Sequence, residues 1–206
     1  MHTDVKLIVL DRDGTINHDR DDFVKSADEW VPIPGALEAI ARLNQAGWHT
    51  VVASNQSGIG RGLFDMATLN AMHLKMHQAL AKVGGRIDAV FFCPHAPEEG
   101  CTCRKPLPGL IQQIHERYGV DAADVPLVGD VLRDLQAGAA AGSPTHLVRT
   151  GKAAKLGEAQ IQAICAQVPG TVVHDDLAAF AEWMIRQERE RRLAAGEAGS
   201  DSGRLN

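Results

Sequence analysis

Residues 5–15, with the sequence VKLIVLDRDGT, constrain the fold more than any other part of this chain. Residues 5–10 have the length and β-branched content of a strand that is buried on both faces, as in a parallel sheet. In open α/β sheets, ligands bind just beyond the carboxyl ends of such strands, which is where Asp11 and Asp13 follow. Strand alternation places both carboxylates on one side, and Gly14 lets the backbone turn beneath them. Two carboxylates this close repel each other, which predicts a shared cation or proton.

Strand and helix patterns alternate along the rest of the chain. Apolar strand segments occur at residues 49–53, 87–92, 125–128, 145–149 and 171–173, and helical patterns begin near residues 35, 65, 108, 132, 155 and 176. This alternation is typical of a three-layer, Rossmann-like α/β fold in which a parallel sheet has helices on both faces. We expect one domain over residues 1–185. Residues 186–206 are charged and then rich in Gly, Ala and Ser, so we expect a disordered tail there.

The composition excludes several classes of partner. The net charge is −5 and the basic residues form no stripe, which argues against nucleic acid. No apolar run approaches the roughly 18 residues of a membrane span, and the first residues do not resemble a signal peptide. Three of the four cysteines are clustered, which does not resemble a disulfide framework. We expect a cytoplasmic monomer that acts on a small molecule.

Polar residues that suit phosphate chemistry follow the predicted strands. Ser54 ends the second strand, Lys105 follows the third, and Asp130 and Asp134 follow the fourth. Taken singly, Ser54 and Asp130 could cap a helix or turn and Lys105 could be a solvated surface lysine, and for Ser54 and Lys105 this structural explanation is the favoured one. The carboxyl ends of parallel strands meet at one edge of a sheet, so together these residues place acids, a hydroxyl group and a cation around one point.

This combination predicts phosphoryl transfer. The transferred group needs an in-line nucleophile, and its equatorial oxygens need positive charge and hydrogen-bond donors. Asp11 can attack phosphorus to give an aspartyl phosphate, with Mg²⁺ held by Asp11 and Asp130 between the two anions. Lys105 would neutralise negative charge on the phosphate oxygens, and Ser54 would donate a hydrogen bond to them. Asp13 would protonate the leaving oxygen and later deprotonate water.

These residues match, in order, the four motifs of the haloacid-dehalogenase-like (HAD-like) phosphatases, and the chain resembles that family. The motifs are Asp11-x-Asp13-Gly-Thr, Ser54 at a strand end, Lys105, and Gly-Asp130-x-x-x-Asp. The resemblance implies Asp11 as nucleophile, Asp13 as acid and base, and Mg²⁺ on Asp11, Asp130 and the main-chain carbonyl of Asp13. Two alternatives from other classes are a phosphate-binding module without turnover and a phosphotransferase. The first would be expected to lack the nucleophile or the acid, whereas the second is compatible with the same motifs.

A second dense cluster of functional side chains is the segment Cys93-Pro-His95-x₅-Cys101-x-Cys103. Three thiols and one imidazole form a complete tetrahedral ligand set for Zn²⁺. A complete set leaves no open coordination position, so we expect a structural zinc ion that orders this loop. The alternative is a group of reduced thiols without metal. Because the last cysteine comes shortly before Lys105, the zinc would fix the position of that lysine.

The short intervals between the four motifs leave no room for a separate cap domain. We therefore expect the site to be roofed by residues 16–34, by residues 56–64 and by the zinc loop. Polar side chains of these segments are the predicted substrate contacts: Asp19, Asp22, Asn55, Gln56, Ser57, Arg61 and Arg104. The carboxylates can accept hydrogen bonds from sugar hydroxyls, and Arg104 offers a planar donor for a second phosphate.

Two sequence segments indicate which of the family's substrates this chain acts on. SNQSGIGRG, which begins at Ser54, and VRTGK, which begins at Val148, resemble those of enzymes acting on a phosphorylated sugar. The resemblance implies removal of the 7-phosphate from a heptose 1,7-bisphosphate, a precursor of the lipopolysaccharide core. Histidinol phosphate is the alternative substrate, because its phosphatases share the zinc loop. Val131 departs from the resemblance, since a basic residue is expected directly after the metal-binding Asp130.

Overall fold

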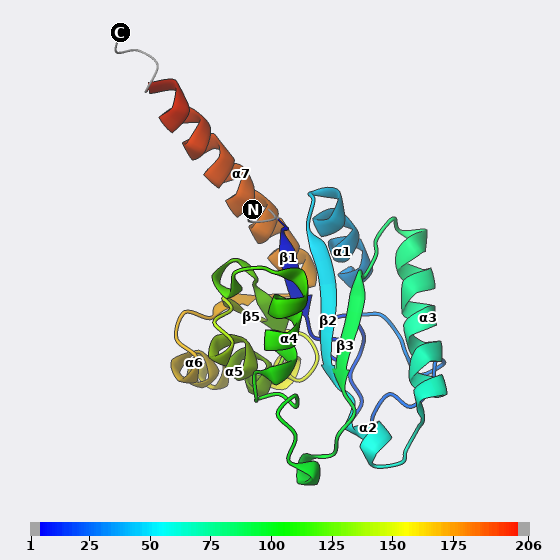
Figure 1. The fold of residues 1–206 in the computed structure, drawn as a ribbon. Helices are drawn as coiled ribbons and strands as arrows, with labels where there is room; N and C mark the ends of the chain where they lie inside the picture. The colour runs from blue at the N-terminus through cyan, green and yellow to red at the C-terminus, as the bar shows by residue number, and fades with distance from the viewer. Residues whose placement is uncertain (1–4, 202–206) are drawn as a thin grey trace.

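The computed structural model describes residues 5–201, with side chains to residue 195, and is built around one six-stranded sheet (Figure 1). The strands lie in the order β3-β2-β1-β4-β5-β6, and every neighbouring pair is parallel. Their bounds are Leu7–Leu10 (β1), His49–Asn55 (β2), Ala89–Cys93 (β3), Leu127–Gly129 (β4), Thr145–Val148 (β5) and Val172–His174 (β6). The α/β class is confirmed, and β1 lies at the point where the strand order changes direction.

Helices cover both faces of the sheet, which makes three layers. Ile8 and Leu10 pack in the same core cluster as α1, α3 and α7, whereas Leu7 and Val9 pack on the opposite face with α4 and α5. All four β1 side chains are 0% exposed, and burying an aliphatic side chain of this size stabilises a fold by about 1.5–3 kcal/mol. The helices are α1 (Ala36–Gln45), α2 (Ser57–Gly60), α3 (Met66–Lys82), α4 (Gly109–Tyr118), α5 (Leu132–Ala140), α6 (Glu158–Gln167) and α7 (Leu177–Asp201).

Local sequence signals set several helix boundaries. The side chain of Asp65 accepts a hydrogen bond from the backbone N–H of Thr68 and caps α3. Gly119 ends α4 with a φ of 62°, a left-handed conformation that glycine adopts without strain. The one-turn helix α2 lies within a segment where the sequence indicated only a loop. Within residues 5–201, no helix combines the length and the apolar character that crossing a membrane requires.

Helix α7 continues past residue 186, where the sequence analysis expected a disordered tail (Figure 1). Two contacts support this part of the helix. Glu188 accepts a hydrogen bond from Lys6 at the start of the sheet, and another from Arg192 Nε at 2.8 Å one turn later. The charged composition thus forms helix-stabilising pairs at positions i and i+4 instead of a solvated tail. The last part of the expected tail, residues 202–206, lies outside the described residues.

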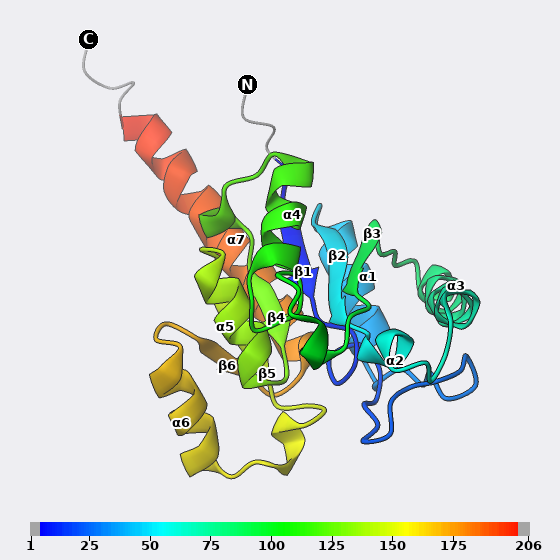
Figure 2. The ribbon, with the colours of Figure 1, turned by 60° about the horizontal axis from the view of Figure 1, so that its bottom comes forward.

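The loops that follow β1, β2, β3 and β4 gather at one edge of the sheet, which faces the viewer in Figure 2. The longest is the irregular segment between β1 and α1, whose residues reach across toward α2 and α3 (Figure 2). Between β1 and β4 the chain forms four α-helices, two short 3₁₀ helices, two strands and the loops that connect them. The described chain therefore places loops, and no separate cap domain, above this edge.

Candidate active site

A fully buried ion-paired lysine marks the centre of this edge. Lys105 Nζ donates a hydrogen bond to Asp11 Oδ1 at 2.6 Å and another to the carbonyl oxygen of Ala53 at 2.8 Å, and it lies 2.8 Å from Asp134 Oδ1. Lys105 is only 2% exposed. An unpaired ammonium group at this depth would be costly, so the two carboxylates and the carbonyl explain why the lysine stays charged. Asp11, Lys105 and Asp134, which belong to three different sequence motifs, are therefore in contact at this edge of the sheet.

The backbone of Lys105 is held as firmly as its side chain. Asn55, the last residue of β2, donates from Nδ2 to the carbonyl oxygen of Lys105 at 3.0 Å. Its Oδ1 accepts from the N–H of the same residue, also at 3.0 Å. The sequence analysis assigned Asn55 to the substrate. The structure shows its amide engaged with Lys105 in both directions, which anchors the lysine-bearing loop to the sheet.

Asp130 follows β4 and is packed between two backbone segments. A Cβ atom built on Gly14, whose φ is 91°, would lie 2.2 Å from Asp130 Oδ2, and a Cβ atom on Gly151 would lie equally close. The N–H of Lys152 donates to the same oxygen at 2.7 Å. Only glycine fits at these two positions, because any larger residue would push the carboxylate away.

Three buried carboxylates share this space. Asp11, Asp130 and Asp134 can each place one oxygen within 4.8 Å of the others. Burial, followed by repulsion from Asp134, raises the pKa of Asp11 to about 7, although Lys105 opposes this shift. Burial and then repulsion from Asp11 raise the pKa of Asp130 to about 8. Burial would lower the pKa of Lys105, but its two carboxylate neighbours raise it overall. Such a cluster of hard oxygen ligands fits a divalent cation such as Mg²⁺.

Asp13 is held in place by three side chains. Its carboxylate accepts two hydrogen bonds from the guanidinium of Arg12, from Nε and Nη2, both at 3.0 Å. Asn17 Nδ2 donates to Oδ1 at 2.8 Å, and Gln56 Nε2 donates to Oδ2 at 3.0 Å. The same Gln56 nitrogen donates to Ser54 Oγ at 2.7 Å. Gln56, which the sequence assigned to the substrate, therefore connects two predicted catalytic side chains.

The cysteine-rich loop also assembles as expected. Cys93, His95, Cys101 and Cys103 can each offer one ligand atom within 4.8 Å of the others. His95 Nδ1 lies 3.4 Å from Cys93 Sγ and 3.3 Å from Cys103 Sγ, and the sulfurs of Cys93 and Cys101 are 3.5 Å apart. Three sulfurs and one imidazole nitrogen converging on one point fit the soft tetrahedral set that Zn²⁺ prefers.

A cavity of about 210 Å³ opens above the carboxylates. It contains the four predicted catalytic residues together with Asp130 and most of the predicted substrate residues. Its lining is Asp11, Asp13, Asp19, Arg20, Asp21, Phe23, Val24, Ser54, Asn55, Gln56, Ser57, Arg61, Arg104, Lys105, Asp130, Val131, Arg133, Asp134 and Lys152. A cavity with several acids at its base and arginines at its wall suits a ligand that carries both phosphate and hydroxyl groups.

Comparisons with known proteins agree with this geometry. A family model described as HAD-hydrolase-like matches residues 102–180. The D-glycero-beta-D-manno-heptose-1,7-bisphosphate 7-phosphatase of Bordetella bronchiseptica is 57% identical over 184 residues, which cover 89% of this chain and 99% of that protein. The enzyme of the same name from Pseudomonas aeruginosa is 48% identical, covering 87% of this chain and 98% of its own. This chain belongs to the HAD-like phosphatase family.

A solved structure supports the same assignment. The crystal structure of the D,D-heptose 1,7-bisphosphate phosphatase from B. bronchiseptica, complexed with magnesium and phosphate, matches with a TM-score of 0.82 and 57% identity. The match covers 89% of this chain and 99% of that one. The phosphatase described here is therefore a phosphoric monoester hydrolase. The resemblance stated from the four motifs is confirmed.

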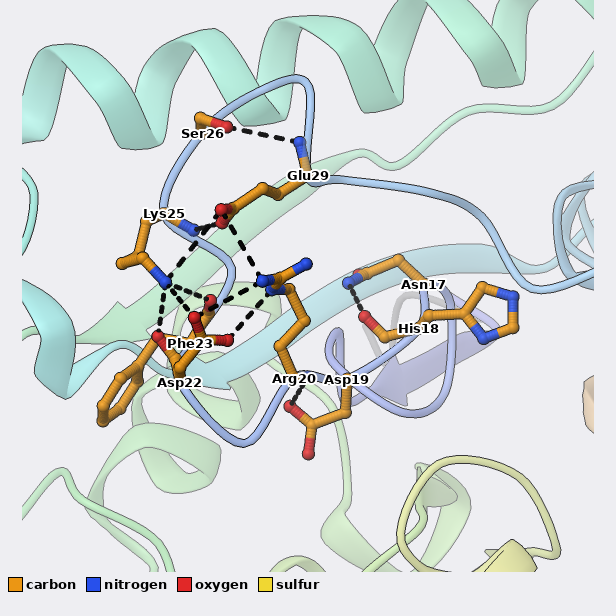
Figure 3. Close-up of polar contacts among 9 residues, drawn as sticks. All are labelled: Asn17, His18, Asp19, Arg20, Asp22, Phe23, Lys25, Ser26 and Glu29. Carbon is orange, nitrogen blue, oxygen red and sulfur yellow. Dashed lines mark hydrogen bonds and ion pairs between the residues drawn. The ribbon is translucent and has the colours of Figure 1, made fainter.

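The loop between β1 and α1 places only one of its two predicted substrate residues at the cavity. Asp19 lines it and lies 3.4 Å from Lys152 Nζ. Asp22 is not among the residues that line the cavity, and it pairs with Arg20 at 3.0 Å and with Lys25 at 2.6 Å, two contacts that Figure 3 draws. Asp21 lines the cavity in its place. An irregular loop has no side-chain period, so the sequence could not distinguish adjacent aspartates.

Sequence analysis also missed a basic residue of the phosphatase. Arg133, in the first turn of α5, lines the cavity and supplies a basic side chain two residues after Val131, the position where the resemblance led us to expect one. Burial, followed by repulsion from Arg133, lowers the pKa of Arg104, and the charge of Arg61 adds to the effect. Three guanidinium groups thus lie close enough to repel one another. The available signal was the position of Arg133 directly before Asp134, on a helix whose start faces the site.

Proposed function

We propose that this phosphatase hydrolyses the 7-phosphate of D-glycero-beta-D-manno-heptose 1,7-bisphosphate through an aspartyl-phosphate intermediate, in the pathway to the lipopolysaccharide core. The observation that carries the mechanism is the buried Lys105 beside Asp11, among three carboxylates. This arrangement keeps a nucleophilic carboxylate in a dry, charge-compensated site. The names of the two relatives above, both heptose bisphosphate phosphatases, support the substrate.

In this proposal Asp11 attacks the phosphorus atom and Asp13 gives a proton to the leaving sugar oxygen. A water molecule then attacks the aspartyl phosphate, and Asp13 removes its proton. Lys105 compensates the charge that accumulates on the phosphate oxygens, and the Ser54 hydroxyl donates to one of them. Asp13 lies two residues beyond the nucleophile, and the hydrogen bonds from Arg12 and Gln56 aim its carboxylate.

Asp11, Asp130 and the main-chain carbonyl of Asp13 would hold Mg²⁺ in this site. Lys105 Nζ lies 2.6 Å from Asp11 Oδ1 and 2.8 Å from Asp134 Oδ1, so one ammonium group compensates only part of the charge of the three carboxylates. Burial, followed by repulsion between the carboxylates, raises the pKa values of Asp11 and Asp130, and a cation would oppose both effects. When bound, Mg²⁺ neutralises charge between the nucleophile and the phosphate and orients the two groups. The magnesium and phosphate in the related B. bronchiseptica crystal structure support this part of the proposal.

The second phosphate of the substrate would bind the arginine cluster at the cavity wall, formed by Arg61, Arg104 and Arg133. Arg104 Nη1 is buried and finds no hydrogen-bond partner among the described residues. A dianionic phosphate would satisfy that donor and relieve the repulsion among the three guanidinium groups. Asp19 and Ser57, which also line the cavity, would contact the sugar hydroxyls.

We further propose that Cys93, His95, Cys101 and Cys103 bind a structural zinc ion. The four ligands leave no position for water or substrate, so the ion would act on stability and not on chemistry. Its place in the chain supports this role, since Cys103 comes two residues before Lys105. The proposal also keeps the expectation of a cytoplasmic monomer, and size-exclusion chromatography tests the oligomeric state.

The decisive experiment compares kcat/KM for the heptose bisphosphate and histidinol phosphate with Mg²⁺ present. We expect a clear preference for the bisphosphate, with release of the 7-phosphate and retention of the 1-phosphate. A preference for histidinol phosphate would overturn the substrate and leave the mechanism intact. Turnover in ¹⁸O-labelled water distinguishes a hydrolase from a phosphotransferase, because only hydrolysis incorporates the label into free phosphate.

A further inference from the structure

A buried arginine lies between the two aspartates of the first motif. Arg12 has no exposed surface, although it follows β1 at the edge of the active site. Its guanidinium donates from Nε and Nη2 to both oxygens of Asp13. Such a bidentate pair fixes the plane of the carboxylate as well as its distance.

The other end of the guanidinium contacts a histidine on α3. Arg12 Nη1 lies 3.2 Å from His73 Nε2, and His73 is only 9% exposed. A guanidinium can only donate hydrogen bonds, so Nε2 must accept and the ring is neutral, with its proton on Nδ1. Burial, followed by the charge of Arg12, lowers the pKa of His73 to about 4, in agreement with a neutral ring.

The two contacts hold the guanidinium from opposite ends. Without His73, Nη1 would be a buried donor lacking a partner, which would lower the stability of the fold if the side chain stayed in place. Rotation of Arg12 toward another acceptor would avoid that cost and would also move its partner Asp13. The orientation of Asp13 therefore depends on a residue that is 60 positions later in the chain.

We propose that His73 is a positioning residue which, through Arg12, aims Asp13 at the leaving oxygen of the substrate. This inference rests on the proposed role of Asp13 as the general acid. His73 is absent from the lining of the cavity, so it acts without contact to substrate. Helix α3 thereby takes part in proton transfer, although the four motifs contain no residue from it.

The test uses two substrates that differ in their need for a proton. A sugar phosphate leaves as an alkoxide and needs the general acid, whereas p-nitrophenyl phosphate leaves as a stable phenolate and needs almost none. Asp13→Asn provides the reference, because it removes the acid directly. His73→Leu should lower kcat/KM for the sugar phosphate about tenfold or more and leave kcat/KM for the aryl phosphate within about threefold.

Matched variants separate positioning from general damage. His73→Gln carries an acceptor oxygen at the distance of Nε2 and should restore the ratio of the two kcat/KM values. His73→Asn carries its acceptor one bond nearer the backbone and should show the defect, which keeps the test usable if the leucine variant fails to fold. His77→Leu, an exposed position one turn further along α3, should leave the ratio unchanged.

A parallel fall for both substrates would reduce His73 to a structural role, and an unchanged ratio in both His73→Leu and His73→Asn would refute the inference. Neither result would affect the proposed function. That proposal fails separately if Asp11→Asn retains normal turnover of the aryl phosphate.

Discussion

Protein freed of Mg²⁺ should lose stability as the pH rises from 7 to 9, because the acidic cluster then gives up its last protons. The matched control is Asp130→Asn, which keeps the shape of the side chain and removes its charge. In the folded state Asp11 titrates at about 7 and Asp130 at about 8. In the unfolded chain both groups titrate near ~3.9 and are fully ionised throughout this range.

The direction of this change in stability depends on how many protons the folded and unfolded states bind. Between pH 7 and 9 the folded state binds more protons than the unfolded state, so the free energy of unfolding falls as the pH rises through the folded pKa values. One pKa unit corresponds to ~1.4 kcal/mol, so the group at about 8 contributes a fall of about 1.4 kcal/mol and the group at about 7 about 0.4 kcal/mol. The expected fall is about 2 kcal/mol for the unmodified protein and about 0.4 kcal/mol for Asp130→Asn, which keeps Asp11, so the difference between the two proteins is about 1.4 kcal/mol.

Urea denaturation of both proteins at several pH values measures this difference. The buried histidines and the thiols titrate alike in both proteins, so their contributions cancel in the comparison. The buffer should lack Mg²⁺ without containing a chelator, because a chelator would also remove the zinc ion that we propose at the cysteine cluster. Saturating Mg²⁺ should abolish most of the fall, since the cation favours the ionised carboxylates. Parallel pH curves for the two proteins without Mg²⁺ would refute the electrostatic account of the site.

Three single substitutions test the remaining assignments. Asp11→Asn should abolish turnover without lowering the melting temperature, and near-normal rates would exclude an aspartyl phosphate. Cys101→Ser should reduce zinc to well below one ion per chain by elemental analysis and lower the melting temperature; full zinc content would contradict the four-ligand site. Arg104→Ala should raise KM for the bisphosphate more than for a small monoester, and equal effects on both substrates would remove Arg104 from the second-phosphate site.

The fold and the catalytic centre were predictable because their signals are local and periodic. Strand β1, residues 7–10, is apolar throughout, since both faces of the sheet are covered, and its carboxyl end had to lie beside those of its parallel neighbours. That reasoning placed Asp11 near Lys105, and the structure finds them 2.6 Å apart. The cysteine cluster was predictable because all four ligands lie close together in the chain.

The direction of loop side chains could not be predicted. Asp21 and Asp22 are chemically identical and adjacent, but Asp21 lines the cavity whereas Asp22 forms ion pairs with Arg20 and Lys25, which Figure 3 draws. Asn55 was expected to contact the substrate because its side chain can hydrogen-bond to sugar hydroxyls, and it does line the cavity. Its actual partner is the backbone of Lys105, fifty positions away, and such a contact leaves no pattern in the sequence.

The strand order has a consequence for how the enzyme becomes active. The chain first builds the β1-β2-β3 wing of the sheet and then crosses to add β4, β5 and β6 on the other side of β1. In the proposed mechanism the first wing supplies the nucleophile Asp11 and is followed by the loop with Lys105, whereas Asp130 follows β4 in the second wing. Each half alone would lack part of the site, so we expect that a chain ending before β4 does not hydrolyse phosphate esters. Turnover therefore requires the two wings to be packed together. If the chain were cut between α4 and β4, we would expect two fragments that are inactive separately and regain activity when they associate.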